Sequence, residues 1–101
     1  MAKTSSIEKN KRRMAMAKAQ LPKRERLKAL AKDESLPFEE RFAARLKLAE
    51  MPRNGALVRV RLRCAFTGRP RANYRKLGIS RITMRELGSK GMIPGLVKSS
   101  W

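Results

Sequence analysis

Histidine is absent from this 101-residue sequence, and cysteine occurs once, as Cys64. A single cysteine cannot form an internal disulfide, so nothing in the sequence favours an oxidising compartment. Without histidine, and with no partner base for Cys64, most forms of acid–base and nucleophilic catalysis lack their usual side chains. We therefore predict that the protein is not an enzyme and has no cofactor.

Long apolar runs and acidic side chains are also scarce. The longest apolar run, residues 14–17, is too short for a membrane-spanning helix or a secretory signal. Asp and Glu number 8 against 26 Lys and Arg, which gives a net charge of +18. A polyanion would relieve the self-repulsion of such a chain and release condensed counterions. Nucleic acid is the predicted partner, rather than a membrane or a small-molecule substrate.

The positive charge changes character halfway along the chain. Residues 1–50 have 8 Lys, 6 Arg and 7 acidic residues, whereas residues 51–101 have 3 Lys, 9 Arg and 1 acidic residue. The planar fork of Arg suits bidentate contacts with phosphate and guanine, so the second half is the predicted site of geometric recognition. Met51-Pro52 and the turn signal Asn54-Gly55 coincide with this change. We predict a helical N-terminal extension over 1–51 and one basic binding region with its tail over 52–101.

Ser5 or Ser6 is placed to cap a first helix that reaches about Gln20. Basic residues, among them Lys11, Arg12 and Arg13, go most of the way round this helix. A helix that is polar on nearly every face is either frayed and solvated or held by something other than a core. The overall charge favours a helix that lies between nucleic-acid backbones.

Two further helices are expected before residue 52. Pro22 fits the first turn of one, with Leu27, Leu30 and Ala31 on one face. Ser35 can cap the other, which carries the clearest apolar stripe in the chain, formed by Phe38, Phe42, Leu46 and Ala49. We predict that this stripe packs, with the two helices forming a hairpin.

The segment "LVRVRLR" (57–63) alternates apolar residues with arginines, which is the period of a β-strand. In a strand, Arg59, Arg61 and Arg63 would project from one side about 6–7 Å apart. Two phosphates along a nucleic-acid strand have a similar separation. We favour such a ladder of phosphate contacts over an ordinary strand with a solvated arginine face, because three like charges side by side repel.

The segment "RCAFTGRPRANYRKLGISRITMREL" (63–87) sets basic residues around turn signals. Gly68 to Arg71 and Gly78 are turn signals, and Tyr74 lies among basic residues where it either stacks on a base or packs. Ser80 is placed to cap a short helix, although a capping box at Thr83 and Glu86 would start that helix later.

Cys64, Thr67, Ser80 and Thr83 have the spacing of a structural zinc site, with two, twelve and two intervening residues. Hydroxyl groups are poor zinc ligands, and one thiolate does not make a site. We predict no bound metal at these four positions.

This segment, together with "LPFEERFAARLKL", "MPRN" and the ending "GMIPGLVKSSW", resembles the S14 family of small-subunit ribosomal proteins in its longer bacterial form. The resemblance covers nearly the whole chain. Some members carry four cysteines at the positions of Cys64, Thr67, Ser80 and Thr83. The resemblance implies a mainly α fold with irregular extended segments, N-terminal helices and a C-terminal, vestigial zinc-ribbon or treble-clef-like knob without metal.

The resemblance also implies a structural role in the ribosome, with the ribosome of the bacterial cytoplasm favoured and that of an organelle as the alternative. The family binds ribosomal RNA in the head of the small subunit, helps to assemble the head and supports the decoding (A) site. Its expected neighbours are small-subunit ribosomal proteins three, ten and nineteen. Rival hypotheses are another DNA-binding or architectural protein and a membrane-active cationic peptide. The predicted RNA contacts are Lys11, Arg12, Arg13, Arg53, Arg59, Arg61, Arg63, Arg69, Arg71, Tyr74, Arg75, Lys76, Arg81, Arg85, Lys98 and Trp101.

Overall fold

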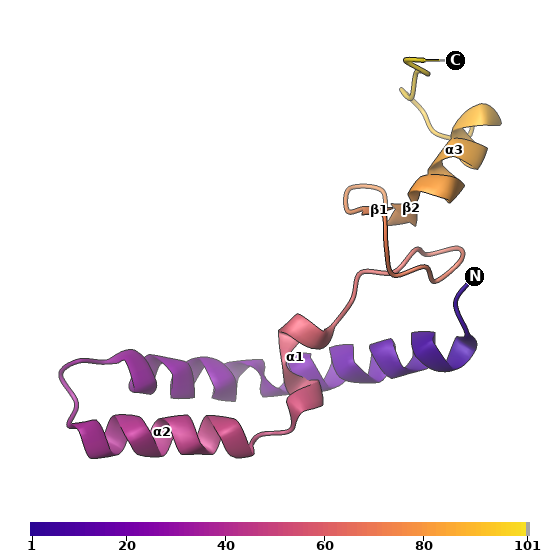
Figure 1. The fold of residues 1–101 in the computed structure, drawn as a ribbon. Helices are drawn as coiled ribbons and strands as arrows, with labels where there is room; N and C mark the ends of the chain where they lie inside the picture. The colour runs from indigo at the N-terminus through magenta and orange to yellow at the C-terminus, as the bar shows by residue number, and fades with distance from the viewer. Residues whose placement is uncertain (101) are drawn as a thin grey trace. The chain divides into compact units, whose positions relative to one another are not determined.

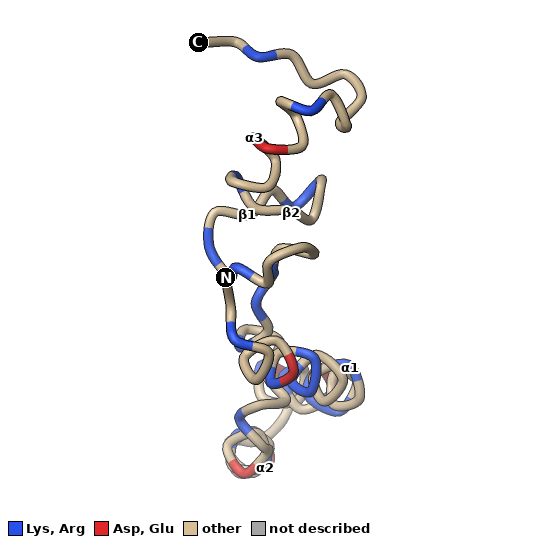
Figure 2. Tube along the Cα trace, turned by 90° about the vertical axis from the view of Figure 1, so that its right-hand side faces the viewer, with Lys and Arg blue, Asp and Glu red and all other residues tan. Residues whose placement is uncertain are grey.

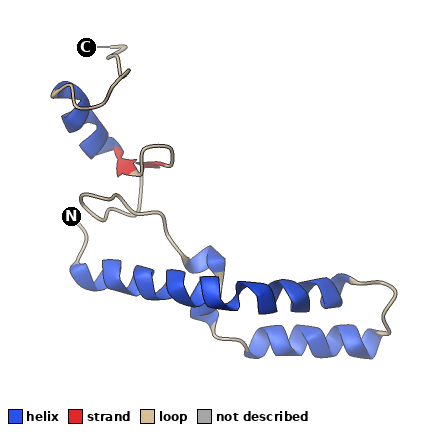
Figure 3. Cartoon of the chain, turned by 180° about the vertical axis from the view of Figure 1, so that it is seen from behind, coloured by secondary structure: helices blue, strands red, loops and turns tan. Residues whose placement is uncertain are grey.

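The computed structural model of the chain describes residues 1–100, so the predicted RNA contact at Trp101 lies outside the described residues. Figure 1 shows the elements in chain order: α1 (Thr4–Lys32), α2 (Phe38–Glu50), single 3-10 turns at Arg53–Gly55 and Leu57–Arg59, β1 (Asn73–Tyr74), β2 (Ile79–Ser80) and α3 (Arg81–Ser89). Helix is the dominant structure, and the strands form one short antiparallel pair (Figure 3). The prediction of a mainly α chain is confirmed.

Two compact units make up the chain. The helical unit is Glu8–Val60, and the second unit, here called the knob, combines Met1–Ile7 with the residues from Arg61 onward. Lys and Arg occur throughout both units, whereas the acidic residue of the knob is Glu86 on α3 (Figure 2).

The prediction that the chain breaks before Pro22 was wrong, because α1 continues through Pro22 to Lys32. Residues on both sides of the proline are held by the segment after α2. Arg24 Nη2 donates a hydrogen bond to the carbonyl of Pro52, and Gln20 fills the space beside the buried Gly55. These contacts offset the hydrogen bond that an interior proline costs a helix. The predicted Ser5 or Ser6 cap is also wrong, because α1 begins at Thr4 and both serines lie inside it.

The core of the helical unit lies between α1 and α2. Leu27 and Ala31 of α1 pack with Ala44 of α2 and Met51, and Leu48 is partly buried against them. The predicted helix pair is therefore present. The predicted Ser35 cap was wrong, because α2 begins at Phe38 with Pro37 at its cap position and no side-chain cap. The Ser35 hydroxyl donates to Asp33 Oδ1 (2.7 Å) instead.

The apolar stripe of α2 is not the face that packs. Phe38, Phe42 and Leu46 are 65%, 48% and 50% exposed, and the two phenylalanine rings stack on each other with centroids 5.9 Å apart. The buried face is the adjoining one, which carries Ala44 and Leu48. The prediction that the aromatic stripe packs was wrong, because small residues allow this helix to approach α1 on the other face.

The expected strand over 57–63 is absent from the described chain. Leu57–Arg59 form a 3-10 turn, in which the Val60 N–H donates to the carbonyl of Leu57 (3.1 Å). The Arg59 side chain turns back to donate to Asn54 Oδ1 (3.1 Å). Arg59, Arg61 and Arg63 therefore do not form the predicted ladder.

Candidate nucleic-acid interface

The knob is built from two tight turns that lead into α3. In the first turn, the Gly68 N–H donates to the Cys64 carbonyl (2.9 Å), and the Cys64 N–H donates to the carbonyl of Arg69 (3.0 Å). In the second, the Gly78 N–H donates to the carbonyl of Tyr74 (2.8 Å). The Ala65 N–H donates to Gly78 O (3.0 Å) and joins the two turns. Both glycines have positive φ, which only glycine adopts without strain.

Between the turns, Ala72 has φ 54°, the left-handed region that an alanine enters at a cost of about 1–2 kcal/mol. This conformation aims the Ala72 carbonyl at the Arg81 N–H (2.9 Å) at the start of α3. Next to it, the Asn73 side chain donates from Nδ2 to the carbonyls of Leu62 (3.0 Å) and Arg69 (2.8 Å). The backbone of the basic segment is thus fixed by the protein's own polar groups.

Ser80 caps α3, as predicted, because the Thr83 N–H donates to Ser80 Oγ (3.3 Å). The same two residues join Cys64 in a buried cluster. Thr83 Oγ1 lies 3.1 Å from Ser80 Oγ and 3.5 Å from Cys64 Sγ. All three side chains are at most 5% exposed. The structure therefore brings together residues that the zinc-like spacing singled out, at distances that suit hydrogen bonds directly between the side chains.

The N-terminus is part of the knob, which the sequence did not suggest. The Ala2 N–H donates to the Thr67 carbonyl (3.2 Å) in the first turn. A Cβ atom on Gly68 would lie 2.6 Å from Ile7 Cδ1, so Ile7 sits directly on the turn. The one available signal was Ile7 itself, a branched apolar residue among the polar residues 3–13.

Comparison with known proteins gives a consistent answer. Residues 47–100 match the family described as Ribosomal protein S14p/S29e. The chain is 71% identical to a protein named small ribosomal subunit protein uS14 from Bradyrhizobium diazoefficiens, with full coverage of both chains. Proteins of the same name from a Methylobacterium species and from Maricaulis maris are 67% and 63% identical, again over the full length of both. The chain belongs to the S14 family of small-subunit ribosomal proteins. The predicted family is confirmed.

Within this S14 chain, Cys64 is the only side chain of its buried cluster that can ionise at moderate pH. Burial raises the pKa of the thiol, but the Thr67 and Thr83 hydroxyls and the backbone N–H groups of Thr67 and Ser80 outweigh burial and lower the pKa to about 5. Thr67 Oγ1 is buried with no hydrogen-bond partner among the described residues, which leaves it able to donate to the thiolate form. The described residues contain no group of three or more His, Cys, Asp or Glu side chains that could hold a metal ion.

The predicted RNA contacts of the S14 chain fall into two classes. Some cations are engaged within the protein. Arg63 Nη1 donates to the Gly68 carbonyl (2.8 Å), Arg69 Nε donates to the Arg71 carbonyl (3.2 Å), and Lys11 pairs with Glu8 (2.9 Å) and lowers the pKa of that carboxyl. Such contacts orient a side chain and leave its other N–H groups for a ligand.

The remaining predicted contacts are described by their exposure, which is high for most of them. In the knob, exposed side chains follow the turns and α3, namely Arg61, Arg71, Tyr74, Arg75, Lys76, Arg81, Arg85 and Lys98. In the helical unit, Arg12 and Arg53 are exposed, while Arg13 and Arg59 are partly buried. None of the helices in the described part of the chain is long and apolar enough to cross a membrane.

Proposed function

We propose that this small-subunit ribosomal protein binds ribosomal RNA in the head of the subunit through the basic knob, as a structural protein without a catalytic role. The observation that carries the proposal is the combination of a backbone fixed by internal hydrogen bonds with exposed cations along it. Asn73 and Ser80 fix the turns and the start of α3. Arg71, Arg75 and Lys76 project from those turns into solvent. Cations on a rigid frame suit phosphates in a fixed array, because little side-chain and backbone freedom is lost on binding.

The same reasoning extends to the wider role. We propose that binding helps to assemble the head and supports the decoding (A) site, beside small-subunit proteins three, ten and nineteen. We also retain the proposal that residues 52–101 act as one RNA-binding unit, with residues 1–51 as a helical extension. The bacterial relatives support a place in the ribosome of the bacterial cytoplasm.

The knob is proposed to be a metal-free version of the zinc-binding form. In a metal-free knob, the hydrogen bonds among Cys64, Ser80 and Thr83 replace the bonds to a metal ion. The support is the 3.1 and 3.5 Å separations between these side chains, which close the cluster directly. Bound RNA would add to this stabilisation by ordering the turns on either side.

The salt dependence of RNA binding tests the proposal. In Arg71→Ala/Arg75→Ala, two exposed cations of the knob are lost. If both touch phosphate, the slope of log affinity against log salt should flatten by about 1–2 units on a transcribed head-domain RNA. The matched control is Arg45→Ala/Lys47→Ala, which removes the same charge from exposed positions on α2.

Equal changes in the two double variants would mean that charge acts diffusely, and the knob would not be the binding site. Binding to a DNA duplex of equal length tests the rival hypothesis that the chain is a general nucleic-acid-binding protein. The proposal requires weaker binding to the duplex than to the folded RNA at the same salt concentration.

A further inference from the structure

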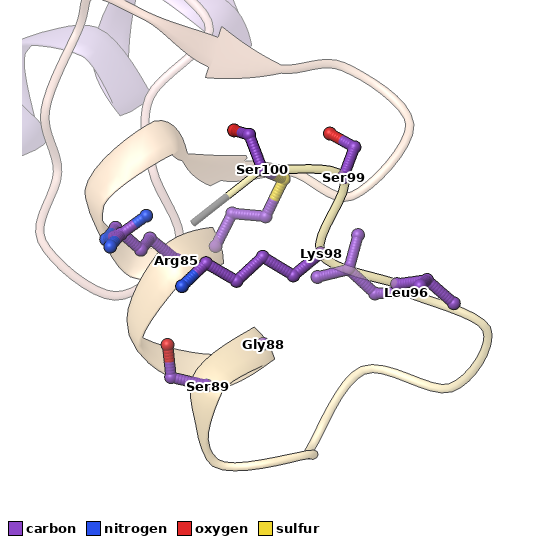
Figure 4. A pocket seen from close by; sticks show the side chains of 9 residues that line it. Arg85, Gly88, Ser89, Leu96, Lys98, Ser99 and Ser100 are labelled. Carbon is purple, nitrogen blue, oxygen red and sulfur yellow. The ribbon is translucent and has the colours of Figure 1, made fainter.

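A groove of about 320 Å³ lies between α3 and the chain that follows it (Figure 4). Met84, Arg85, Gly88 and Ser89 line it from the helix, and residues 96–100 line it from the tail. Gly88 brings the two walls together, since a Cβ atom there would lie 2.5 Å from Leu96 Cδ2. The close approach of the two walls thus requires glycine at position 88, which takes no part in the two turns of the knob.

The lining combines three kinds of chemistry. Met84, Leu96 and Val97 supply apolar surface, and Leu96 and Val97 are 43% and 85% exposed. Ser89, Ser99 and Ser100 supply hydroxyls. Among the described residues, the charged groups of the lining are two cations, Arg85 and Lys98, with no acidic residue. In Figure 4 the Lys98 side chain extends from the tail toward α3, on the side where the Arg85 guanidinium lies.

We propose that this groove binds a single unstacked nucleotide of the RNA, an inference that rests on the proposed function. The 5′-phosphate lies between Arg85 and Lys98, the base lies on the apolar wall, and the serine hydroxyls face the ribose. Two cations beside an apolar surface complement an anionic group joined to a flat apolar one. A volume of about 320 Å³ exceeds the need of a bare phosphate and is at the lower end of small-ligand sites. Single-stranded RNA presents such splayed nucleotides, whereas a duplex does not.

The test is a titration of the isotope-labelled full chain followed by NMR, with adenosine 5′-monophosphate (AMP), inorganic phosphate and adenosine as separate probes. AMP should shift the amide signals of Gly88, Ser89 and Ser99, with an affinity at least about tenfold above that of either fragment, because only AMP uses both the cations and the apolar wall. Arg85→Ala should weaken AMP binding about tenfold, as expected for one charge-assisted hydrogen bond. Arg45→Ala on α2 is the matched control and should leave AMP affinity unchanged.

Gly88→Ala provides a second, independent variant. The added methyl group displaces Leu96 and should weaken AMP more than phosphate, because the apolar wall moves and the cations stay. Equal affinities for AMP and phosphate would refute the proposal that the groove binds a nucleotide, and would show a simple anion site instead. Tighter binding of a tetraglutamate peptide at the same amides would overturn it in favour of an acidic protein segment.

The head-domain RNA separates this inference from the proposed function. If the full chain binds that RNA but the amide signals of the groove do not shift on addition of AMP, the groove proposal alone is refuted. If the chain does not bind the RNA, both proposals are refuted.

Discussion

The contact between the N-terminus and the first turn of the knob can be tested with two glycine variants. Gly68 and Gly78 have nearly the same backbone conformation, with φ 72° and 66°. Gly68→Ala and Gly78→Ala therefore carry the same cost of about 1–2 kcal/mol for an L-residue in the left-handed region. Their surroundings differ, because nothing lies within 4 Å of a Cβ atom at Gly78, whereas one at Gly68 meets Ile7 Cδ1 at 2.6 Å and Ala2 Cβ at 3.3 Å.

Overpacking at such a contact costs about 1–3 kcal/mol in addition. Gly68→Ala should thus destabilise the knob more than Gly78→Ala by about 1–3 kcal/mol, which is roughly 5- to 150-fold in the exchange rate of amides that open with the knob. The assay is hydrogen exchange on the full chain. The reporters are the Cys64 and Ala65 amides, which donate to Arg69 O and Gly78 O.

A double variant isolates the contact. Ile7→Ala removes the atoms that meet the new methyl group, so Ile7→Ala/Gly68→Ala should be less destabilised than the sum of its single variants. Ile7→Ala/Gly78→Ala should be additive. Equal exchange in the Gly68 and Gly78 variants, or additivity in both pairs, would refute the packing of the N-terminal residues on this turn.

Three shorter predictions concern the thiol, the metal and the hairpin. The thiolate absorbance of Cys64 should rise with a midpoint of about pH 5, and not near 9.0, the usual pKa of a thiol. Because the pKa is lower in the folded protein, the thiolate should stabilise the knob increasingly from pH 5 to pH 9, and this stabilisation should be lost as the pH falls to 5. Thr83→Val should raise the midpoint, and a wild-type midpoint above about pH 8 would contradict the geometry. Elemental analysis should find no stoichiometric zinc in the purified protein, and a one-to-one signal would refute the metal-free knob. Phe42→Ala should lower the free energy of unfolding, measured in urea, by less than about 1 kcal/mol, and Leu48→Ala should lower it by about 2 kcal/mol. The reverse order would mean that the aromatic stripe is the packed face of α2.

Local signals in the sequence predicted α2 and α3 well. The period of the apolar residues before Met51 defined a helix, and Ser80 occupies the cap position that its side chain favours. Periodicity could not choose between two adjoining apolar faces of α2. The choice depends on how closely the backbone of α1 approaches, which favours Ala44 over the larger Phe42.

The failures came from contacts between residues far apart in the sequence. Pro22 is a local signal for a helix start, but Arg24 and Gln20 on either side of it are held by residues 52–55. The alternating arginines after Leu57 have the period of a strand, but the described residues offer them no neighbouring strand to pair with, and the chain forms a 3-10 turn instead. At the candidate site, the spacing singled out Cys64, Thr67, Ser80 and Thr83, and the family resemblance gave that spacing its meaning. The structure places Cys64, Ser80 and Thr83 within hydrogen-bond distance of one another along a chain of contacts. The groove beside Gly88 had no comparable signal.

The composition of the knob has a consequence for the order in which a newly made chain can fold. The helical unit is one continuous segment, Glu8–Val60, and is complete as soon as its last residue leaves the ribosome that makes it. The knob can fold only after the helical unit has been synthesised, because its first seven residues are made first and their partners, from Arg61 onward, are made last. Closing the loop from Ala2 to Thr67 costs roughly 4 kcal/mol of chain entropy for a flexible segment, but a preformed helical unit replaces most of that segment with a rigid one. Helices first and knob last is therefore the sequence of events that this topology favours during synthesis.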